Sequence, residues 1–503
     1  MRHSRLRVVN GVRVRVVMTL LMLAIQASLA QNASRIKQAV DDSAVIRIPN
    51  STHPLTARAA DLGRVDSHLP MQRMVLVLKP SEAQETELAR LLDRQHDKNS
   101  AAYHQWLTPE EYGRRFGPSK VDLTQITSWL QQKGFHIDAI ARGKQWIEFS
   151  GDAGQVEQAF HTEVHHFMVR GAERIANAHD ISVPQALVPV VTGILSLHNI
   201  PKTGDAKRQH IHRDETNGKL MPDFTITGSA GTFHFLAPGD YKKIYNLEPL
   251  LDAGIDGRGI SIAIAGRTDI FLSDVHTFRK IFGLPTNDPV VIHNGQVPGV
   301  NPDFVESSLD VEWAGAAAPK ATIELVASAS TLTTDGIDLS LSYIIDNAIA
   351  PIMSTSYSAC EPFMGTAGNA HITGLYRQAA AEGITAFAST GDSGSANCDP
   401  SGEFPSPASD SATVSGLAST PYTVSVGGTQ FDENGLDGLY WLPDNRADLS
   451  SAMGYIPEQV WNESCDPTVD PAGCFGSGLY LWLATGGGPS NCSTSTISGD
   501  FIT

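Results

Sequence analysis

The stretch Asp256-Gly-Arg-Gly-Ile-Ser-Ile-Ala-Ile-Ala265 gives the clearest fold signal in the chain. A glycine-rich turn leads into a run of small and apolar residues without polar alternation, which is typical of a strand buried on both faces. Similar runs occur at Thr322–Val326, Ala350–Met353, Ile384–Ala388 and Thr423–Val426, with helical patterns at Thr333–Asn347 and Gly374–Gly383. Buried strands that alternate with helices predict an α/β domain with a mostly parallel sheet.

A second domain is predicted upstream, over residues 70–200. Helices are expected at Glu82–Gln95 with Ser81 as N-cap, from Thr108 as the cap before Pro109, at Leu123–Lys133 and from Val156. Strands are expected at Met74–Leu78, Phe135–Ile140, Trp146–Phe149 and Glu163–Val169. This mixture predicts a compact α+β domain. Residues 31–69 are expected to be a leader, with order beginning at Met71. Residues 201–230 are basic and poor in apolar side chains, and are either an ordinary connector or an exposed maturation site.

The N-terminus has the layout of a secretory signal peptide over residues 1–30. Five arginines lie between positions 2 and 15, and an apolar run follows at Val16–Ile25. Ala27-Ser-Leu-Ala30 then offers small residues for cleavage. The run is too short for a bilayer, which needs about 20 residues per helix. We expect a secreted protein with no membrane contact after cleavage, although an uncleaved anchor is the alternative.

Chain length and net charge indicate the number of domains and argue against nucleic-acid binding. The chain has 503 residues and a formal net charge of −17. At roughly 100–200 residues per domain, this length predicts about two to four domains. An acidic chain is a poor nucleic-acid binder, because phosphate contacts need Lys and Arg.

All five cysteines lie in the last third of the chain. Export permits disulfides, and Cys360 with Cys398 and Cys465 with Cys474 are plausible pairs. Sequence leaves the connectivity open, and Cys492 has no evident partner. None of the spacings is typical of a zinc site.

Glu306 and Asp310 lie four residues apart in a segment that predicts a helix, so they share one helix face. Two neighbouring carboxylates push their pKa values apart, and such a pair can supply a base and its supporting acid. The commoner alternative is a solvated acidic helix face.

Asp392 follows the strand predicted at Ile384–Ala388, within Ala388-Ser-Thr-Gly-Asp-Ser-Gly-Ser395. The C-terminal ends of parallel strands are where α/β sheets place active-site groups. Alternatively, Asp392 stabilises only its own turn. Two other glycine runs, Val426–Thr429 and Ala484–Ser490, are not specific by themselves.

The motifs together resemble the sedolisin family of serine-carboxyl peptidases, which are similar to kumamolisin. The resemblance covers about residues 70–500. Its motifs, in the family's order, are Glu306-x-x-x-Asp310, Trp313-Ala-Gly-Ala-Ala-Ala-Pro319, Thr390-Gly-Asp-Ser-Gly-Ser395, Val426-Gly-Gly-Thr429 and Thr485-Gly-Gly-Gly488, and upstream Tyr103-His-Gln-Trp-Leu-Thr108 resembles the activation propeptide.

The resemblance implies a subtilisin-like catalytic domain at residues 231–503, preceded by a ferredoxin-like propeptide at 70–200 and a maturation site within 201–230. Glu306 is expected to be the general base of a Ser-Glu-Asp triad, Asp310 its supporting acid and Asp392 a protonated oxyanion-hole donor. Carboxyl groups in these roles fit an acidic pH optimum. The expected partners are polypeptide substrates and the propeptide itself as an intramolecular inhibitor, and the family binds calcium.

The chain departs from the family in its nucleophile. After Asp392 no serine stands in a Gly-Thr-Ser context, and Ser490 corresponds to a serine that is not catalytic in the family. The calcium site is expected beyond Thr503, so no calcium ligand is assigned. Three explanations compete: a truncated chain whose sheet lacks its final strands, a pseudoenzyme, or a mislocated nucleophile. The alternative functions are a protein that binds peptides or a related protease without cleaving them, and a secreted α/β protein of another kind, such as an adhesin.

Overall fold

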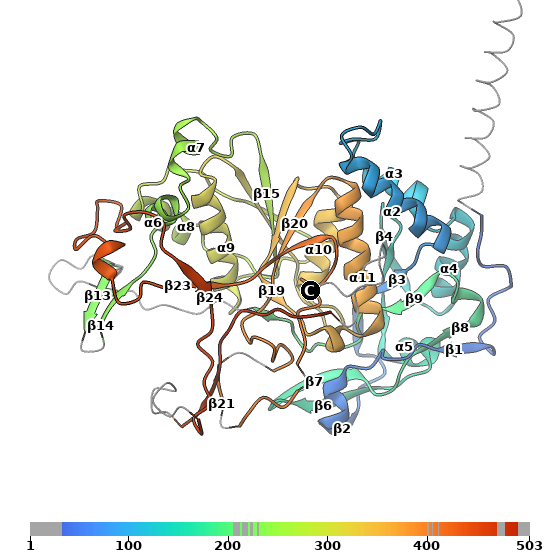
Figure 1. The fold of residues 1–503 in the computed structure, drawn as a ribbon. Helices are drawn as coiled ribbons and strands as arrows, with labels where there is room; N and C mark the ends of the chain where they lie inside the picture. Colours follow the sequence, from blue (N-terminus) through green and yellow to red (C-terminus); the bar gives the residue numbers. More distant parts are fainter. Residues whose placement is uncertain are drawn as a thin grey trace, which may run out of the picture.

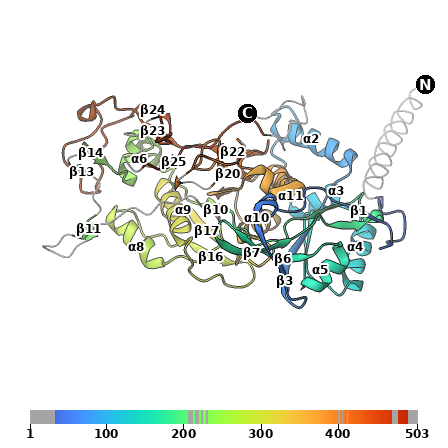
Figure 2. The same ribbon diagram turned by 90° about the horizontal axis from the view of Figure 1, so that it is seen from below.

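The computed structural model describes residues 33–204, 235–399, 402–404, 406–410, 412–469 and 478–490, with short strands at 212–213, 220–221, 225–228 and 231–234. The described chain forms two parts that pack side by side. The N-terminal part, residues 33–200, lies on the right of Figure 1, and the C-terminal part, residues 235–490, on the left. Figure 2 shows the same division from below.

The N-terminal part is an α+β structure, as the sequence predicts. Its elements are β1 (Val45–Arg47), η1 (Pro54–Arg58), β2 (Ala60–Arg64), β3 (Pro70–Leu78), α2 (Glu82–His96), α3 (Pro109–Phe116), α4 (Lys120–Gln132), β4 (His136–Ile140), β5 (Trp146–Asp152), α5 (Ala153–Phe160), β6 (Val164–Val169), β7 (Ala172–Asn177), β8 (Ser182–Pro184), η2 (Gln185–Leu187) and β9 (Val191–Ile194). The main sheet is antiparallel in the order β4-β5-β3-β9, and a second sheet has the order β2-β6-β7.

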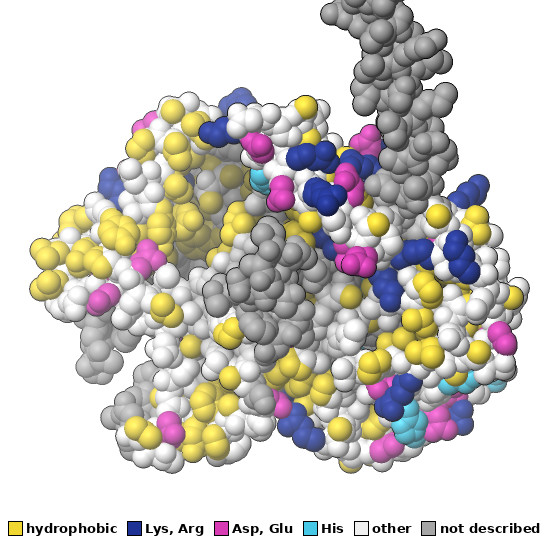
Figure 3. Space-filling view, turned by 45° about the vertical axis from the view of Figure 1, so that its right-hand side comes forward, with side chains coloured by type: hydrophobic (Ala, Val, Ile, Leu, Met, Phe, Trp, Pro, Cys, Tyr) yellow, Lys and Arg dark blue, Asp and Glu magenta, His cyan; other side chains and the backbone are white. Residues whose placement is uncertain are grey.

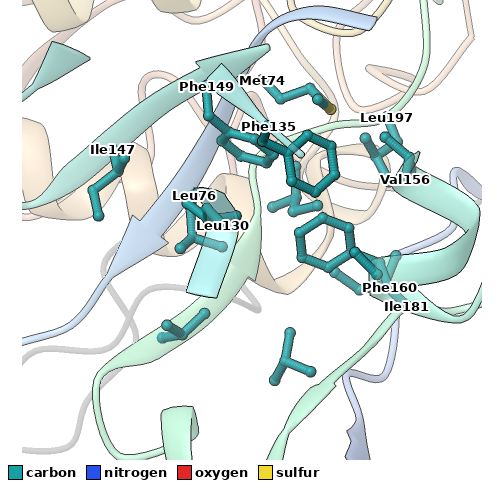
Figure 4. Packing of buried hydrophobic residues seen from close by; sticks show 14 of the residues in the cluster. Met74, Leu76, Leu130, Phe135, Ile147, Phe149, Val156, Phe160, Ile181 and Leu197 are labelled. Atoms are coloured by element: carbon teal, nitrogen blue, oxygen red, sulfur yellow. The ribbon is translucent and has the colours of Figure 1, made fainter. Parts of the chain in front are cut away.

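Aromatic side chains fill the core between the main sheet and helices α4 and α5 (Figure 4). The Phe135 and Phe149 rings meet edge to face with centroids 5.1 Å apart, and Phe160 of α5 lies beside both. Met74 and Leu130 are fully buried in the same cluster. This core belongs to residues upstream of 200, so the N-terminal part has the hydrophobic centre that a domain needs.

Helix starts in the N-terminal part follow the predicted caps. The Ser81 and Thr108 hydroxyls accept hydrogen bonds from the backbone N–H groups of Gln84 and Glu111, three residues on. Both helices thereby satisfy one of their free backbone donors. The expectation that order begins at Met71 is wrong, because β1 and β2 precede it. Each pairs with a later strand, β1 with β8 and β2 with β6, and this pairing orders the segment.

The C-terminal part is an α/β structure around a parallel sheet. Its elements include α6 (Pro238–Ile244), α7 (Glu248–Asp252), β15 (Ser261–Gly266), α8 (Leu272–Ile281), β16 (Val290–His293), α9 (Phe304–Ala317), β17 (Thr322–Ala327), α10 (Gly336–Asp346), β18 (Ile352–Thr355), β19 (Tyr357–Ser358), α11 (Glu361–Ala381), β20 (Thr385–Ser389), β21 (Gly402–Phe404), β22 (Thr423–Val426), β23 (Thr429–Phe431), η3 (Asp437–Leu439), β24 (Glu458–Val460) and β25 (Tyr480–Trp482). The six-stranded sheet has the order β16-β17-β15-β18-β20-β22 with every pairing parallel.

Helices cover both faces of this sheet. In Figure 1, α9 lies to the left of the sheet, whereas α10 and α11 lie to its right. Ile264 and Leu325 of the sheet pack with Val311 of α9 on one face. Met353 and Ala386 pack with helices α10 and α11 on the other. The predicted mostly parallel α/β sheet is confirmed, whereas the subtilisin-like and ferredoxin-like assignments stay predictions.

The N-terminal part packs against α10 and α11. Val75 and Trp146, from its main sheet, belong to the same buried cluster as Ile372 and Leu375 of α11. Polar contacts add to this packing, since Asp346 at the end of α10 accepts hydrogen bonds of 2.8 Å from the backbone N–H groups at 142 and 143. The two parts therefore share one continuous apolar interface.

The sheet ends at β22 within the described part of the chain. Val424 and Val426 of this strand are exposed. Val460 is also exposed, on β24, which pairs with the next strand along the chain, β23. Hydrophobic side chains are frequent on the left of the space-filling view, whereas charged side chains gather on the right (Figure 3). The described sheet thus has an open apolar edge on one side.

The predicted disulfide between Cys360 and Cys398 is confirmed. Cys465 is also disulfide-bonded, but Cys474 and Cys492 lie outside the described residues. The predicted signal peptide lies outside them too. Among the helices that the structure describes, none combines the length and apolar character needed to cross a bilayer.

Candidate active site

Glu306 and Asp310 lie on α9, one turn apart, as the sequence predicts. The helix begins just after Asp303, whose backbone N–H donates to Oδ1 of Asn301 over 2.9 Å in the turn that precedes it. Glu306 is 5% exposed. The pair does not form a solvated acidic helix face, because both side chains point toward the protein interior rather than water.

Asp310 accepts a hydrogen bond of 2.7 Å on Oδ1 from the hydroxyl of Ser356, directly after β18. Its Oδ2 is buried and has no hydrogen-bond partner among the described residues. Burial raises the pKa of Asp310 to about 7, against the opposing effect of the Ser356 hydrogen bond. A neutral Asp310 is therefore favoured well above the pH range in which an exposed aspartate ionises.

Tyr357 lies next to both carboxyl groups. Its side chain is fully buried, and burial raises the pKa of its phenol, with further contributions from the charges of Asp303, Glu306 and Asp310. The guanidinium of Arg267 sits 4.9 Å from the centre of the Tyr357 ring and opposes this rise. The site thus combines acidic groups, a neutral phenol and a cation in a water-poor space.

Arg267 follows β15 and joins the N-terminal end of α9 to α10. It forms ion pairs with Asp303 and with Asp335, and donates to the backbone oxygen of Lys202 over 2.9 Å. Burial alone would lower the pKa of Arg267, but the charges of Asp335 and Asp303 raise it. A charged Arg267 therefore fixes the start of the helix that carries Glu306.

Asp392 lies on a loop that follows β20. Since β18 and β20 are neighbouring parallel strands, Ser356 and Asp392 follow strands that end at the same edge of the sheet. Gly391 has a φ of +93° and comes so close to β19 that a Cβ there would lie 3.2 Å from Cβ of Ser358. The loop of Asp392 is therefore packed against the segment that contacts Asp310.

Three predicted glycine motifs converge at this loop. The backbone N–H of Thr390 donates to the oxygen of Val426 over 3.0 Å, and the N–H of Gly486 donates to the oxygen of Gly391 over 2.8 Å. The N–H of Gly428 donates to the Thr485 hydroxyl over 2.7 Å. Motifs that are far apart in the sequence thus form one layer of backbone around Asp392.

The segment at the end of the N-terminal part reaches the same place. Strand β10 (Thr203–Gly204) pairs antiparallel with β19, with Thr203 opposite Ser358 and Gly204 opposite Tyr357. Lys202 anchors it through an ion pair of 2.5 Å between its Nζ and Oδ2 of the buried Asp338. Chain from the upstream part therefore lies directly beside the carboxyl pair.

Ser356, Tyr357 and Arg267 were not predicted from the sequence. The rule that singled out Asp392 applies to Ser356 as well, because this hydroxyl also follows a predicted parallel strand. No local pattern marks Arg267, whose partners lie 36 and 68 residues away.

The described residues contain no group of three or more His, Cys, Asp or Glu side chains that could hold a metal ion. The calcium site that the resemblance implies stays a prediction, and no residue of the chain is assigned to it.

Comparisons with known proteins agree with the resemblance. Residues 57–200 match the Pro-kumamolisin activation domain. Xanthomonalisin from Xanthomonas sp. (strain T-22) is 26% identical over 477 residues, which cover 89% of this chain and 52% of that protein. Sedolisin from Pseudomonas sp. (strain 101) is 25% identical, covering 81% of this chain and 63% of that protein.

The chain is similar to proteins of the sedolisin family over most of its length. Human tripeptidyl-peptidase 1 is a further relative, 25% identical over 76% of this chain and 66% of its own length. The chain thus spans about half to two thirds of the length of the curated relatives it matches. The solved structure "Pseudomonas sedolisin (serine-carboxyl proteinase) complexed with two molecules of pseudo-iodotyrostatin" aligns with a TM-score of 0.37 and 22% identity, over 53% of this chain and 68% of that one.

The family match begins at residue 57, inside the segment that the sequence predicts as a leader. This agrees with the pairing of β2 in the structure. The roles of Glu306, Asp310 and Asp392 stay predictions at this point, as do the remaining domain boundaries.

Proposed function

We propose that this chain is the precursor of a secreted serine-type endopeptidase that hydrolyses polypeptides at acidic pH. The observation that carries the proposal is the buried Glu306–Asp310 pair, held by Ser356 at the sheet edge where the Asp392 loop lies. A carboxylate works best as a general base near its own pKa, so such a site is suited to acid.

In the proposed reaction, the Glu306 carboxylate accepts the proton of a serine hydroxyl while the serine oxygen bonds to the peptide carbonyl carbon. Asp310 supports Glu306, and its raised pKa keeps it able to donate a hydrogen bond in acid. Asp392, when protonated, donates a hydrogen bond to the carbonyl oxygen as it gains negative charge. Glu306 then returns the proton to the departing amine, and water hydrolyses the acyl-enzyme. The nucleophilic serine is not assigned within residues 1–503.

The upstream part is proposed to inhibit the site until it is removed. The match to an activation domain supports this role. The pairing of β10 with β19 supports it further, because an extended peptide added to a strand beside the site occupies the place that a substrate backbone would take. Cleavage within residues 201–230 is proposed to release the inhibition.

The proposal is tested by incubating the expressed chain with an acid-unfolded protein at about pH 4, near carboxylate pKa values. We expect Glu306→Gln to reduce the cleavage rate by about 10²–10⁴-fold, the usual contribution of a general base. The matched control is Glu312→Gln, on the same helix, where burial raises the pKa of Glu312 to about 7 outside the proposed pair. Equal rates for the wild type and Glu306→Gln would reject Glu306 as the base.

A second candidate function is peptide binding without cleavage, by an inactive fragment or pseudoenzyme. The sequence observation that favours it is the lack of a Gly-Thr-Ser serine after Asp392. It predicts saturable binding of unfolded polypeptide and no cleavage by the wild type. Reading the coding DNA past codon 503 separates the two candidates, since an in-frame Gly-Thr-Ser segment supports the peptidase and a verified stop codon supports the binding protein.

A further inference from the structure

We infer that Glu361 is a positioning residue that fixes the Asp392 loop, defined as residues 390–398, through hydrogen bonds to Ser419 and Ser490. The inference rests on the proposed function, because only that function gives Asp392 a catalytic role that needs a fixed loop. The geometry of the contacts is independent of that role.

Glu361 is a fully buried acidic residue, and glutamate side chains are seldom fully buried in proteins. It is 0% exposed and begins the first turn of α11, which the non-helical backbone of Gly365 separates from the rest of the helix. Its Oε1 accepts hydrogen bonds from the hydroxyls of Ser419 and Ser490, which lie 58 and 129 residues further along the chain. One carboxyl oxygen thus joins two segments to the start of a helix.

Ser490 connects Glu361 to the Asp392 loop. It is 1% exposed and ends the segment 484–490. This segment runs along the loop, with a hydrogen bond of 2.9 Å from the N–H of Ala484 to the oxygen of Asp392 and one of 2.8 Å from the N–H of Gly394 to the oxygen of Ala484. A third bond joins Gly486 to Gly391 over 2.8 Å. The hydrogen bond from Ser490 to Glu361 therefore anchors the segment that backs Asp392.

The neighbouring residue anchors the other end of the loop. Cys360 precedes Glu361 and forms the disulfide with Cys398, the last residue of the loop. Inside the loop, Asn397 donates a hydrogen bond of 3.3 Å to the oxygen of Thr390. Two adjacent residues at the start of α11 thus hold the loop, Cys360 covalently and Glu361 through the segment packed on it.

The energetics favour a positioning role over simple stabilisation. Burying a carboxylate is costly unless hydrogen bonds compensate, and well-packed apolar side chains often stabilise a core as much or more. A buried acid shared by two distant segments fixes their relative geometry, because each hydroxyl must point at the same oxygen. We therefore expect its loss to loosen the loop more than the fold.

Hydrogen exchange tests the inference on the full chain. Ser490→Ala removes one donor at little cost to packing, and we expect amide exchange at Gly394 and Gly486 to rise at least tenfold, with strands β15 to β18 unchanged. The matched control is Ser342→Ala, a buried serine on α10 whose hydroxyl bonds to His371 over 3.0 Å, far from the loop in sequence. It should leave exchange in the Asp392 loop unchanged.

Substitutions of Glu361 itself supply a rescue test. Glu361→Gln keeps an acceptor oxygen and should hold loop exchange within about threefold of the wild type, whereas Glu361→Leu removes the acceptor and should raise it at least tenfold. Unchanged loop exchange in Ser490→Ala, or an equal rise over the whole sheet, would overturn the inference. Hydrogen exchange is measured without any peptide cleavage. Its result therefore tests the role of Glu361 even if the chain proves to have no peptidase activity.

Discussion

Ser356 donates a hydrogen bond of 2.7 Å to Oδ1 of Asp310, and this contact joins helix α9 to the end of strand β18. The other oxygen of Asp310 is buried without a hydrogen-bond partner among the described residues. A carboxyl group in this setting is easier to keep neutral than ionised. The contact therefore links the fold to the protonation state of Asp310, and it leads to the first prediction.

Asp310→Asn should stabilise the protein at pH 8 and have little effect at pH 4. Burial raises the pKa of Asp310 to about 7, above its ordinary value of 3.8, so the folded state binds the proton more tightly. The stability that comes from this proton is complete below about pH 4 and is lost as pH rises through about 7. Asparagine resembles the neutral acid and avoids the loss, which amounts to roughly 4 kcal/mol for about 3 pKa units.

Urea unfolding midpoints at pH 4 and pH 8 check this prediction, with the exposed Asp252→Asn as control. A variant that is less stable than the wild type at pH 8 would contradict it.

His53→Asn should make the chain more resistant to acid. Burial, with smaller contributions from the nearby His198, Arg170 and Lys202, lowers the pKa of His53 to about 2. The ring packs 4.9 Å from that of Phe363 on α11, at the interface between the two parts. A lowered folded pKa means stability that is present above about pH 6.5 and is lost as pH falls below it, by about 1.4 kcal/mol per unit.

Asparagine can still accept the hydrogen bond that Nδ1 of His53 takes from the N–H of Leu55. We expect the fall in melting temperature between pH 6.5 and pH 4 to be smaller in His53→Asn than in the wild type. The exposed His68→Asn serves as control. If the melting temperature of His53→Asn falls with pH as steeply as that of the wild type, protonation of His53 does not contribute to the loss of stability in acid.

Lys202→Met should loosen the attachment of the N-terminal part. The Lys202 side chain is 15% exposed and Asp338 only 1%, so the substitution leaves a buried carboxylate without its cation. Breaking a buried ion pair typically costs about 3–5 kcal/mol, whereas replacing both partners by apolar side chains is often neutral. The double variant Lys202→Met/Asp338→Leu should therefore recover most of the stability, as measured by urea unfolding. A double variant as unstable as the single one would contradict the ion-pair explanation.

Cys398→Ala should destabilise the C-terminal part by up to about 4 kcal/mol, the chain-entropy value for a closed loop of this length. The disulfide joins residues 38 apart in the sequence. Urea unfolding of the variant and the wild type under non-reducing conditions measures the effect, because the disulfide of Cys465 then stays intact in both. No difference between the variant and the wild type would mean that the loop is held by its other contacts alone.

The sequence predicted strands and helices where short-range patterns are strong. The buried strand of β15 and the caps at Ser81 and Thr108 match the structure because apolar runs and capping residues act locally. The expectation that order begins only at Met71 was wrong, because β1 and β2 pair with strands more than 100 residues away.

The candidate site was predicted in part. Spacing alone places Glu306 and Asp310 on one helix face, and the glycine motifs mark the Asp392 loop. Arg267, Ser356 and Glu361 were missed because each acts through contacts between segments distant in sequence, and no local pattern encodes these.

The proposed function makes this chain a precursor, and we propose further that the site of Glu306 itself cuts the connection to the N-terminal part. Mass spectrometry and N-terminal sequencing after incubation at about pH 4 test it most directly. We predict a new N-terminus within residues 201–230 in the wild type and none in Glu306→Gln, with Glu312→Gln cut as the wild type is. A wild-type chain that stays intact, or a Glu306→Gln chain cut at the same rate, would contradict the account.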